Sequence, residues 1–159
     1  MIRVGTGFDA HRFAAGRALV MGGVSIKHDM GLEGHSDADV LCHAMADALL
    51  GAIADGDIGK HFPNTDAAWK DARSLEMLGI VAGRVRARGG RICNIDSTII
   101  AERPRMAEHI DEMRSNIANA LNIRSSNVSV KATTVEGMGA LGRGEGIAAM
   151  ASAVVEMRE

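Results

Sequence analysis

The sequence predicts an α+β fold in which one mixed β-sheet is covered by helices on one face. Two observations carry this prediction. Segments of alternating apolar and β-branched residues recur along the chain, and three longer segments have apolar residues at helical spacing. Their order is β-β-α-α-β-α-β-β, so helices separate the strands only in part, which favours a mixed sheet over a parallel doubly wound one. We expect residues 1–159 to form one domain, because a chain of 159 residues can bury enough surface to fold without a disulfide or structural metal.

The chain opens with two β elements. Residues Ile2 to Asp9 have the composition of a strand. Leu19 to Ile26 contains two short apolar runs on either side of Gly22 and Gly23, and this pattern predicts a hairpin because glycine adopts the backbone angles of tight turns.

A buried helix is predicted over Ala38 to Ala54, because this segment is apolar almost all round and contains no proline. Ser36 or Asp37 is expected to cap its N-terminus. The turn-rich segment 55–66 that follows is long enough to suggest a functional role.

Three polar side chains interrupt that helix at intervals of four residues: Asp39, His43 and Asp47. They form one stripe, and burying such a stripe is costly unless something binds it. Asp39 and Asp47 are either partners that orient His43 or ordinary capping and surface acids. Cys42 points roughly 100° away from its neighbour His43 on a helix, so we expect it to pack in the core.

The remaining elements show either helical spacing or strand alternation. They are helices over Ser74–Arg88 and Ala107–Leu121, and strands over Ile92–Ala101, Val128–Ala132 and Ile147–Met157. The first of these helices is expected to end at Gly89-Gly90. Pro104 cannot donate to a central strand and therefore predicts a loop. The segment 133–146 is glycine-rich and separates the last two strands.

Composition and charge exclude several classes of protein. Lys and Arg number 18, Asp and Glu number 20, and no run of like charge is long enough for a nucleic-acid or membrane-binding arm. With three Phe, one Trp and no Tyr, the chain has few side chains on which bases could stack. No stretch approaches the roughly 20 apolar residues of a membrane span. Cys42 and Cys93 form no CxxC pair, and we expect a cytoplasmic protein with no nucleic-acid or membrane partner.

Asp9, His11 and His43 are candidate metal ligands. Asp9 and His11 lie two residues apart at the end of a predicted strand, so their side chains should project from the same face. One carboxylate and two imidazoles suit Zn²⁺ and leave one position open, as a catalytic site requires. The spacing alone also fits a strand-end turn with a hydrogen-bonded core histidine. It fits the facial triad of a mononuclear non-haem iron oxygenase as well, although predicted helices are not typical of the jelly rolls that carry that triad.

Two segments are candidate phosphate sites. His35, Ser36 and Asp37 precede the buried helix, where free amides and the helix dipole favour an anion, although a plain helix cap explains the same residues. Segment Thr133–Glu136 opens a glycine-rich turn in which hydroxyls and amides can hold phosphate and a carboxylate can hold Mg²⁺, and ordinary turn chemistry is the alternative. Segment Gly142–Gly146 lacks the Lys-Ser/Thr ending of a P-loop, so an NTPase is not indicated.

Several motifs occur together in one order. They are FDAHRF at Phe8–Phe13, GHSDADVLCHAMADALLGA at Gly34–Ala52, GDIGKHFPNTD at Gly56–Asp66, STIIAERPRM at Ser97–Met106 and VKATTVEGMGALGRGEGIA at Val130–Ala148. With these motifs in register, the sequence resembles the 2-C-methyl-D-erythritol 2,4-cyclodiphosphate synthase family from Ile2 to about Val155.

The resemblance implies a homotrimer with an active site at each subunit interface. The substrate would be 4-diphosphocytidyl-2-C-methyl-D-erythritol 2-phosphate, and the products the cyclic diphosphate and CMP. The metal ligands implied are Asp9, His11 and His43 for one Zn²⁺ per chain, and Glu136 for a Mg²⁺ or Mn²⁺ held at the diphosphate. His35 and Thr134 would be the catalytic residues that position phosphate and stabilise the transition state.

The resemblance also assigns residues that contact the substrate. Segment 57–59 would hold the methylerythritol hydroxyls, and segment 101–107 would form the cytidine pocket. The full set is Asp9, Ala10, His11, His35, Ser36, Asp57, Ile58, Gly59, Phe62, Pro63, Asn64, Thr65, Asp66, Ala101, Glu102, Arg103, Pro104, Arg105, Met106, Ala107, Thr133, Thr134, Val135, Glu136 and Arg143.

Two positions depart from the family's pattern. Arg105 stands where many members have Lys, which keeps the charge and changes its geometry. Ala140 stands where an aromatic residue is common, near the expected trimer axis, and this puts a hydrophobic ligand cavity there in doubt. The alternative to an enzyme is a catalytically silent nucleotide-binding or assembly module that keeps the trimer and the cytidine pocket.

Overall fold

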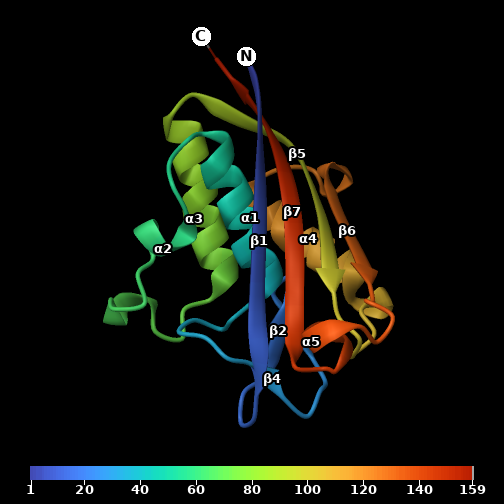
Figure 1. Ribbon diagram of the computed structural model, residues 1–159. Coiled ribbons are helices and arrows are strands. Elements are labelled where there is room, and N and C mark those ends of the chain that lie inside the picture. Colours follow the sequence, from blue (N-terminus) through green and yellow to red (C-terminus); the bar gives the residue numbers. More distant parts are fainter. Residues whose placement is uncertain (159) are drawn as a thin grey trace.

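The computed structural model describes residues 1–158 and has the expected mixed sheet. The strand order is β4-β1-β7-β5-β6. The strands are β1 (Ile2–Ala14), β4 (Gly31–Leu32), β5 (Gly90–Ile100), β6 (Val128–Thr133) and β7 (Gly146–Met157). The β5–β6 pair is parallel, whereas β1 pairs antiparallel with β4 and β7, and β7 pairs antiparallel with β5 (Figure 1). The strand that follows all others in the sequence therefore lies at the centre of the sheet.

The predicted hairpin is confirmed as a separate two-stranded sheet. It consists of β2 (Leu19–Met21) and β3 (Val24–Ile26), in antiparallel register. Gly22 and Gly23 form the turn with φ of 57° and 73°, angles at which a side chain is strained.

Helix α1 (Val40–Ala52) confirms the predicted buried helix, but the expected cap was wrong. Asp39, and neither Ser36 nor Asp37, caps the helix: its Oδ1 accepts a hydrogen bond from the Cys42 amide at 3.1 Å. The reason lies in the backbone, since Ala38 is left-handed with φ of 58° and the chain becomes helical only after Asp39. The side chains of Ser36 and Asp37 are thereby free to make other contacts.

Helices α3 (Ser74–Ala87) and α4 (Ile110–Leu121) join α1 on one face of the sheet (Figure 1). Both confirm the predicted helices, although residues 107–109 form a 3-10 turn before α4 begins. The core between helices and sheet contains the large, fully buried side chains Leu41, Leu49, Leu78, Ile99 and Ile117. The helical spacing indicated this face correctly because one stripe of each helix must be covered by the sheet.

Four short helical elements were not predicted, nor was the two-residue strand β4. The helical elements are α2 (Ile58–His61), the 3-10 helices Ala67–Trp69 and Ser125–Asn127, and α5 (Gly139–Gly142). Each is a single turn, too short to show a hydrophobic period. Two of them lie within or just after the long segment that the sequence predicted to be functional.

The other face of the sheet carries exposed apolar side chains. Ile2, Val4 and Phe8 of β1 are 59%, 64% and 60% exposed, and Met150 of β7 is 53% exposed. These residues point away from the helices because side chains alternate along a strand. They form an apolar row on β1 that Thr6 interrupts, with Met150 of β7 opposite Phe8.

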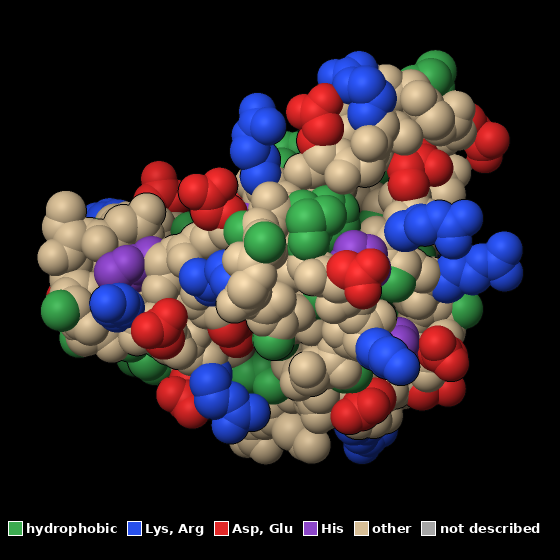
Figure 2. Space-filling view, turned by 90° about the horizontal axis from the view of Figure 1, so that it is seen from below, with side chains coloured by type: hydrophobic (Ala, Val, Ile, Leu, Met, Phe, Trp, Pro, Cys, Tyr) green, Lys and Arg blue, Asp and Glu red, His purple; other side chains and the backbone are tan. Residues whose placement is uncertain are grey.

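The charged surface shows no strong bias where it is visible. On the face seen in Figure 2, Lys and Arg side chains are interspersed with Asp and Glu side chains, with smaller hydrophobic areas between them. Among residues 1–158, no helix combines the length and the hydropathy that crossing a membrane requires.

Candidate active site

Two glycines bring α1 unusually close to β1. A Cβ on Gly5 would lie 1.9 Å from the Ala48 carbonyl oxygen, and one on Gly7 would lie 2.0 Å from the Ala44 carbonyl oxygen. Only glycine permits this approach. Asp9 follows at the next position on the same face of the strand, so the close contact places it beside α1.

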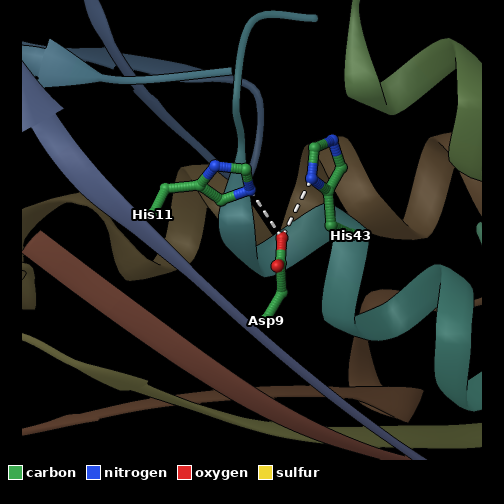
Figure 3. Close-up of side chains that lie close together, drawn as sticks. All are labelled: Asp9, His11 and His43. Carbon is green, nitrogen blue, oxygen red and sulfur yellow. Dashed lines mark hydrogen bonds and ion pairs between the residues drawn. The ribbon is translucent and has the colours of Figure 1, made fainter. Parts of the chain in front are cut away.

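Asp9, His11 and His43 converge as predicted (Figure 3). Asp9 Oδ2 lies 2.8 Å from His11 Nε2 and 3.0 Å from His43 Nδ1. One ligand atom from each residue lies within 4.8 Å of the other two, so the three can share one ion. His11 Nδ1 donates to the Glu33 carbonyl oxygen at 2.6 Å, which leaves Nε2 directed at the shared position.

The electrostatics of the cluster favour an ionised carboxylate. Burial raises the pKa of Asp9, but hydrogen bonds and the charges of His11 and His43 outweigh burial and hold that pKa far below its usual range. Burial lowers the pKa of His11, and the Asp9 carboxylate reverses this and raises it. A negative carboxylate between two imidazoles is a site for a cation.

The cluster opens into a hollow of about 230 Å³. Its lining is Asp9, His11, Gly34, His35, Ser36, His43, Ile58, Gly59, Phe62, Asn64, Trp69 and Met77. His35 Nε2 donates to the Asp66 carbonyl oxygen at 3.1 Å, which fixes the ring at the rim. The predicted anion segment and the predicted functional loop therefore meet at the candidate metal position.

The α2 segment is held against this hollow by carboxylates. Asp47 Oδ1 accepts the Ile58 amide at 2.7 Å, and Asp57 caps α2 through the Lys60 amide at 2.9 Å. Burial raises the pKa of Asp47. Asp47 is thus neither a partner of His43 nor a free surface acid: it anchors the loop.

Asp39 also has a role other than orienting His43. Its carboxylate is fully buried and accepts the amides of Cys42 and Gly23, the latter at 2.8 Å. Burial raises its pKa and also that of the Cys42 thiol, which packs in the core as expected. Ser36 and Ser74 contact Nε2 of His43, and neither contact was predicted. A serine at a predicted helix start was visible, but no spacing connects it with His43.

A second hollow, of about 370 Å³, lies at the predicted cytidine segment. It is lined by Ala101 to Ala107 and by Ala132 to Thr134. Glu102 Oε1 accepts the amides of Val135 at 3.0 Å and Gly137 at 3.3 Å, so it ties the two loops together. This hollow shares no lining residue with the metal-site hollow.

Several residues assigned by resemblance lie outside both hollows in this chain: Ala10, Asp57, Pro63, Thr65, Asp66, Val135, Glu136 and Arg143. Ala10 is exposed on β1 between two residues of the metal cluster, so alternation directs it to the opposite face. Glu136 is exposed in a left-handed turn with φ of 54°, and its Oε1 accepts from the Thr134 hydroxyl at 3.4 Å. Arg143 pairs with Glu145 at 2.8 Å.

Comparison with known proteins gives consistent matches over the whole chain. Residues 2–156 match the model of the YgbB family. The 2-C-methyl-D-erythritol 2,4-cyclodiphosphate synthase of Salinibacter ruber is 56% identical over 155 residues, which is 98% of this chain and 99% of that protein. The protein of the same name from Bacillus cereus is 54% identical over 158 residues, covering 99% and 100%.

Solved structures agree with these matches. The bifunctional IspDF from Campylobacter jejuni superimposes with a TM-score of 0.95 at 42% identity, over all of this chain and 43% of that longer chain. The CDP complex of IspF from Plasmodium falciparum superimposes with a TM-score of 0.86 at 30% identity, over 99% of this chain and 97% of that one.

Proposed function

Since the chain belongs to the YgbB family and to the 2-C-methyl-D-erythritol 2,4-cyclodiphosphate synthases, we propose that it converts 4-diphosphocytidyl-2-C-methyl-D-erythritol 2-phosphate to the cyclic diphosphate and CMP. It is an enzyme of isoprenoid precursor synthesis, of the lyase class. The observation that carries this function is the convergence of Asp9, His11 and His43 on one position inside a hollow. A mixed sheet with helices on one face is not a jelly roll, so the iron oxygenase interpretation was wrong.

The proposed reaction needs no nucleophile from the protein. An oxygen of the substrate's 2-phosphate forms a bond to the β-phosphorus. The bond from that phosphorus to the oxygen bridging the α-phosphate breaks, and CMP leaves with the electron pair. The protein's task is to fold a flexible polyanion into an in-line arrangement and to balance its charge.

We assign Asp9, His11 and His43 to one Zn²⁺ per chain. The donor set supports this assignment, because one carboxylate and two imidazoles leave an open position for a phosphate oxygen. We assign a Mg²⁺ or Mn²⁺ at the diphosphate to Glu136, whose exposed carboxylate lies beside the Thr134 hydroxyl. When bound, the two cations supply positive charge to phosphate oxygens as charge develops on them.

The other residues bind and orient the substrate. His35 is held at the rim of the metal-site hollow and Thr134 in the cytidine hollow, where each is proposed to position phosphate. Ile58 and Gly59 line the metal-site hollow and, with Asp57, are proposed to hold the methylerythritol hydroxyls. The backbone around Pro104 is proposed to hold the cytosine.

We propose that the working enzyme is a homotrimer whose active site lies between two subunits. Two observations support this arrangement. The metal-site and cytidine hollows of one chain share no lining residue. We propose that the substrate occupies the metal-site hollow of one copy and the cytidine hollow of another. The exposed apolar row Ile2, Val4, Phe8 and Met150 offers a surface for another copy to cover.

The free thiols of Cys42 and Cys93 support the expected cytoplasmic location.

Phosphorus NMR of the product tests the proposal directly, because a cyclic diphosphate and a linear hydrolysis product give different spectra. Purified protein should contain about one zinc per chain, and CMP release should require added Mg²⁺ or Mn²⁺. His43→Ala should abolish zinc binding and CMP release. His28→Ala is the matched control, since among residues 1–158 His28 bonds only to Met30 and stacks on Phe13. A linear product, or CMP release that survives His43→Ala, would overturn the assignment.

A further inference from the structure

A chain of hydrogen bonds leads away from the metal position through His43, and its contact between His43 and Ser74 is buried. The ring has Nδ1 directed at Asp9 and Nε2 directed inward, where Ser74 Oγ lies at 2.9 Å. The Ser74 hydroxyl in turn donates to Asp37 Oδ1. The Ser74 side chain thus connects the candidate metal ligand His43 to a carboxylate, Asp37, that does not touch the metal position.

The direction of these hydrogen bonds follows from the chemistry of their ends. An ionised carboxylate can only accept, so the single proton of the Ser74 hydroxyl belongs to Asp37. Ser74 Oγ then presents only lone pairs to His43, so this contact is a hydrogen bond only when Nε2 carries the hydrogen. When a cation takes the place of the hydrogen between Nδ1 and Asp9 Oδ2, Nδ1 offers its lone pair to the position that His11 and Asp9 share.

The carboxylate end of the chain is itself fixed at several points. Asp37 Oδ2 accepts the Ser74 amide at 3.0 Å, Asp37 Oδ1 also accepts the Asp39 amide at 3.2 Å, and the Asp37 amide donates to the Ala72 carbonyl at 3.0 Å. Ser74 is 1% exposed and is the first residue of α3. The start of α3 is therefore locked to the loop that precedes α1.

Ser36 is the other hydroxyl near the same ring nitrogen. Its Oγ lies 3.2 Å from His43 Nε2 and accepts the Ala38 amide at 3.2 Å. Ser36 is a weaker partner than Ser74, because its distance to the ring is longer and no carboxylate orients its hydroxyl.

We propose that Ser74 and Asp37 are positioning residues of the metal centre, which hold the proton of His43 on Nε2 so that Nδ1 is the ligand atom. The inference rests on the proposed function, because it takes the cluster of Asp9, His11 and His43 as a zinc site. It extends that function to two residues that touch neither the metal position nor either hollow. A partner that orients a metal-binding imidazole typically changes metal affinity roughly 10–100-fold.

The test is the zinc affinity of the full chain, measured by competition with a chromophoric chelator. Ser74→Ala should weaken zinc binding roughly 10–100-fold. Asp37→Asn should weaken it in the same direction and to a smaller extent, because an amide keeps the shape and can still accept one bond. Ser74→Thr, which keeps the hydroxyl, should restore most of the affinity. Ser115→Ala is the control, since Ser115 is exposed on α4 and, in the part of the chain that the structure describes, its side chain bonds only to the Asp111 carbonyl.

Two further measurements separate positioning from general damage to the fold. The visible absorption of the Co²⁺-loaded protein reports the ligand field at the metal, and it should change in Ser74→Ala and not in Ser115→Ala. The double variant of Ser74→Ala and Asp37→Asn should lose no more affinity than Ser74→Ala alone, because both act through one chain. Additive losses, with an unchanged Co²⁺ spectrum, would indicate a merely structural role and overturn the inference.

The outcomes distinguish this inference from the function on which it rests. If the wild-type chain binds no zinc, both the proposed metal centre and this inference are overturned. If the wild-type chain binds zinc and folded Ser74→Ala and Asp37→Asn bind it equally well, only the inference is overturned. Should Ser74→Ala not fold, Asp37→Asn and Ser74→Thr decide the question alone.

Discussion

Replacing Gly7 with alanine is expected to separate the two elements that build the metal site. The new Cβ would lie 2.0 Å from the Ala44 carbonyl oxygen and 2.8 Å from the Ala48 amide nitrogen. Ordinary contact begins at 3.4 Å, so α1 must move away from β1 by about 1.4 Å. Overpacking of this kind costs about 1–3 kcal/mol, and we expect the upper end because both obstructing atoms are helix backbone.

The same displacement should weaken metal binding, because His43 moves with α1 while Asp9 stays on β1. Metal–ligand distances tolerate deviations of only about 0.2 Å, so zinc affinity should fall at least about tenfold. A reacting group misplaced by about 1 Å can cost roughly 100-fold in turnover, and CMP release should fall accordingly.

Urea unfolding and zinc competition measure the two effects separately. Gly83→Ala is the matched control, because Gly83 lies in α3 and a Cβ there meets no described atom within 4 Å beyond its chain neighbours and its own helix backbone. That substitution should leave zinc binding unchanged and stabilise the helix by up to about 1 kcal/mol. If Gly7→Ala unfolds at the wild-type urea concentration and binds zinc like the wild type, close contact between β1 and α1 does not position the cluster.

Three further predictions follow from contacts around the site. Burial raises the pKa of Asp55, but hydrogen bonds and charge from Arg84 and Arg88 outweigh burial and lower that pKa. The ionised carboxylate therefore stabilises the fold above about pH 4, near the pKa of an unfolded Asp. This stabilisation is lost as the pH falls through the lowered pKa of the folded state. Asp55→Asn should therefore lower the free energy of unfolding by about 2–4 kcal/mol at pH 7, a range reduced because both arginines are about half exposed. In urea titrations at about pH 3, the difference in unfolding free energy between variant and wild type should be smaller. Asp47→Ala leaves the Ile58 amide without its acceptor and should raise KM more than it lowers kcat in steady-state assays, whereas Asp47→Asn should retain most activity. Zinc at about 100 times its Kd should raise the free energy of unfolding by about 2.7 kcal/mol over the chelator-treated protein, and an equal Tm with and without zinc would contradict a folded-state metal site.

The regular elements were predictable because their periodicity reports burial. The helices over 74–87 and 110–121 and the central strands each have one covered face, and their residue spacing reflects it. The one-turn helix α2 was not predictable, because Asp57 and Asp47 hold it in place through hydrogen bonds that leave no period in the sequence.

The metal cluster was predictable only in part. The same-face placement of Asp9 and His11 follows from strand alternation. The position of His43 beside Asp9 depends on Gly5 and Gly7, which allow α1 to pack closely on β1. The sequence does not show which helix packs on these two glycines. Ser74 belongs to a third element, and nothing in the spacing of 31 residues between it and His43 indicates their contact.

The central position of β7 has a consequence for how the protein is made. Its partners β1 and β5 are translated earlier, and neither pairs with the other in the finished sheet. Until β7 emerges from the ribosome, both must wait with open backbone edges, which are the sites where strands of different molecules join. The sheet can therefore close only after β7 has been synthesised. A chain stalled on the ribosome before residue 146 would keep unpaired edges on β1 and β5, where strands of other molecules can pair.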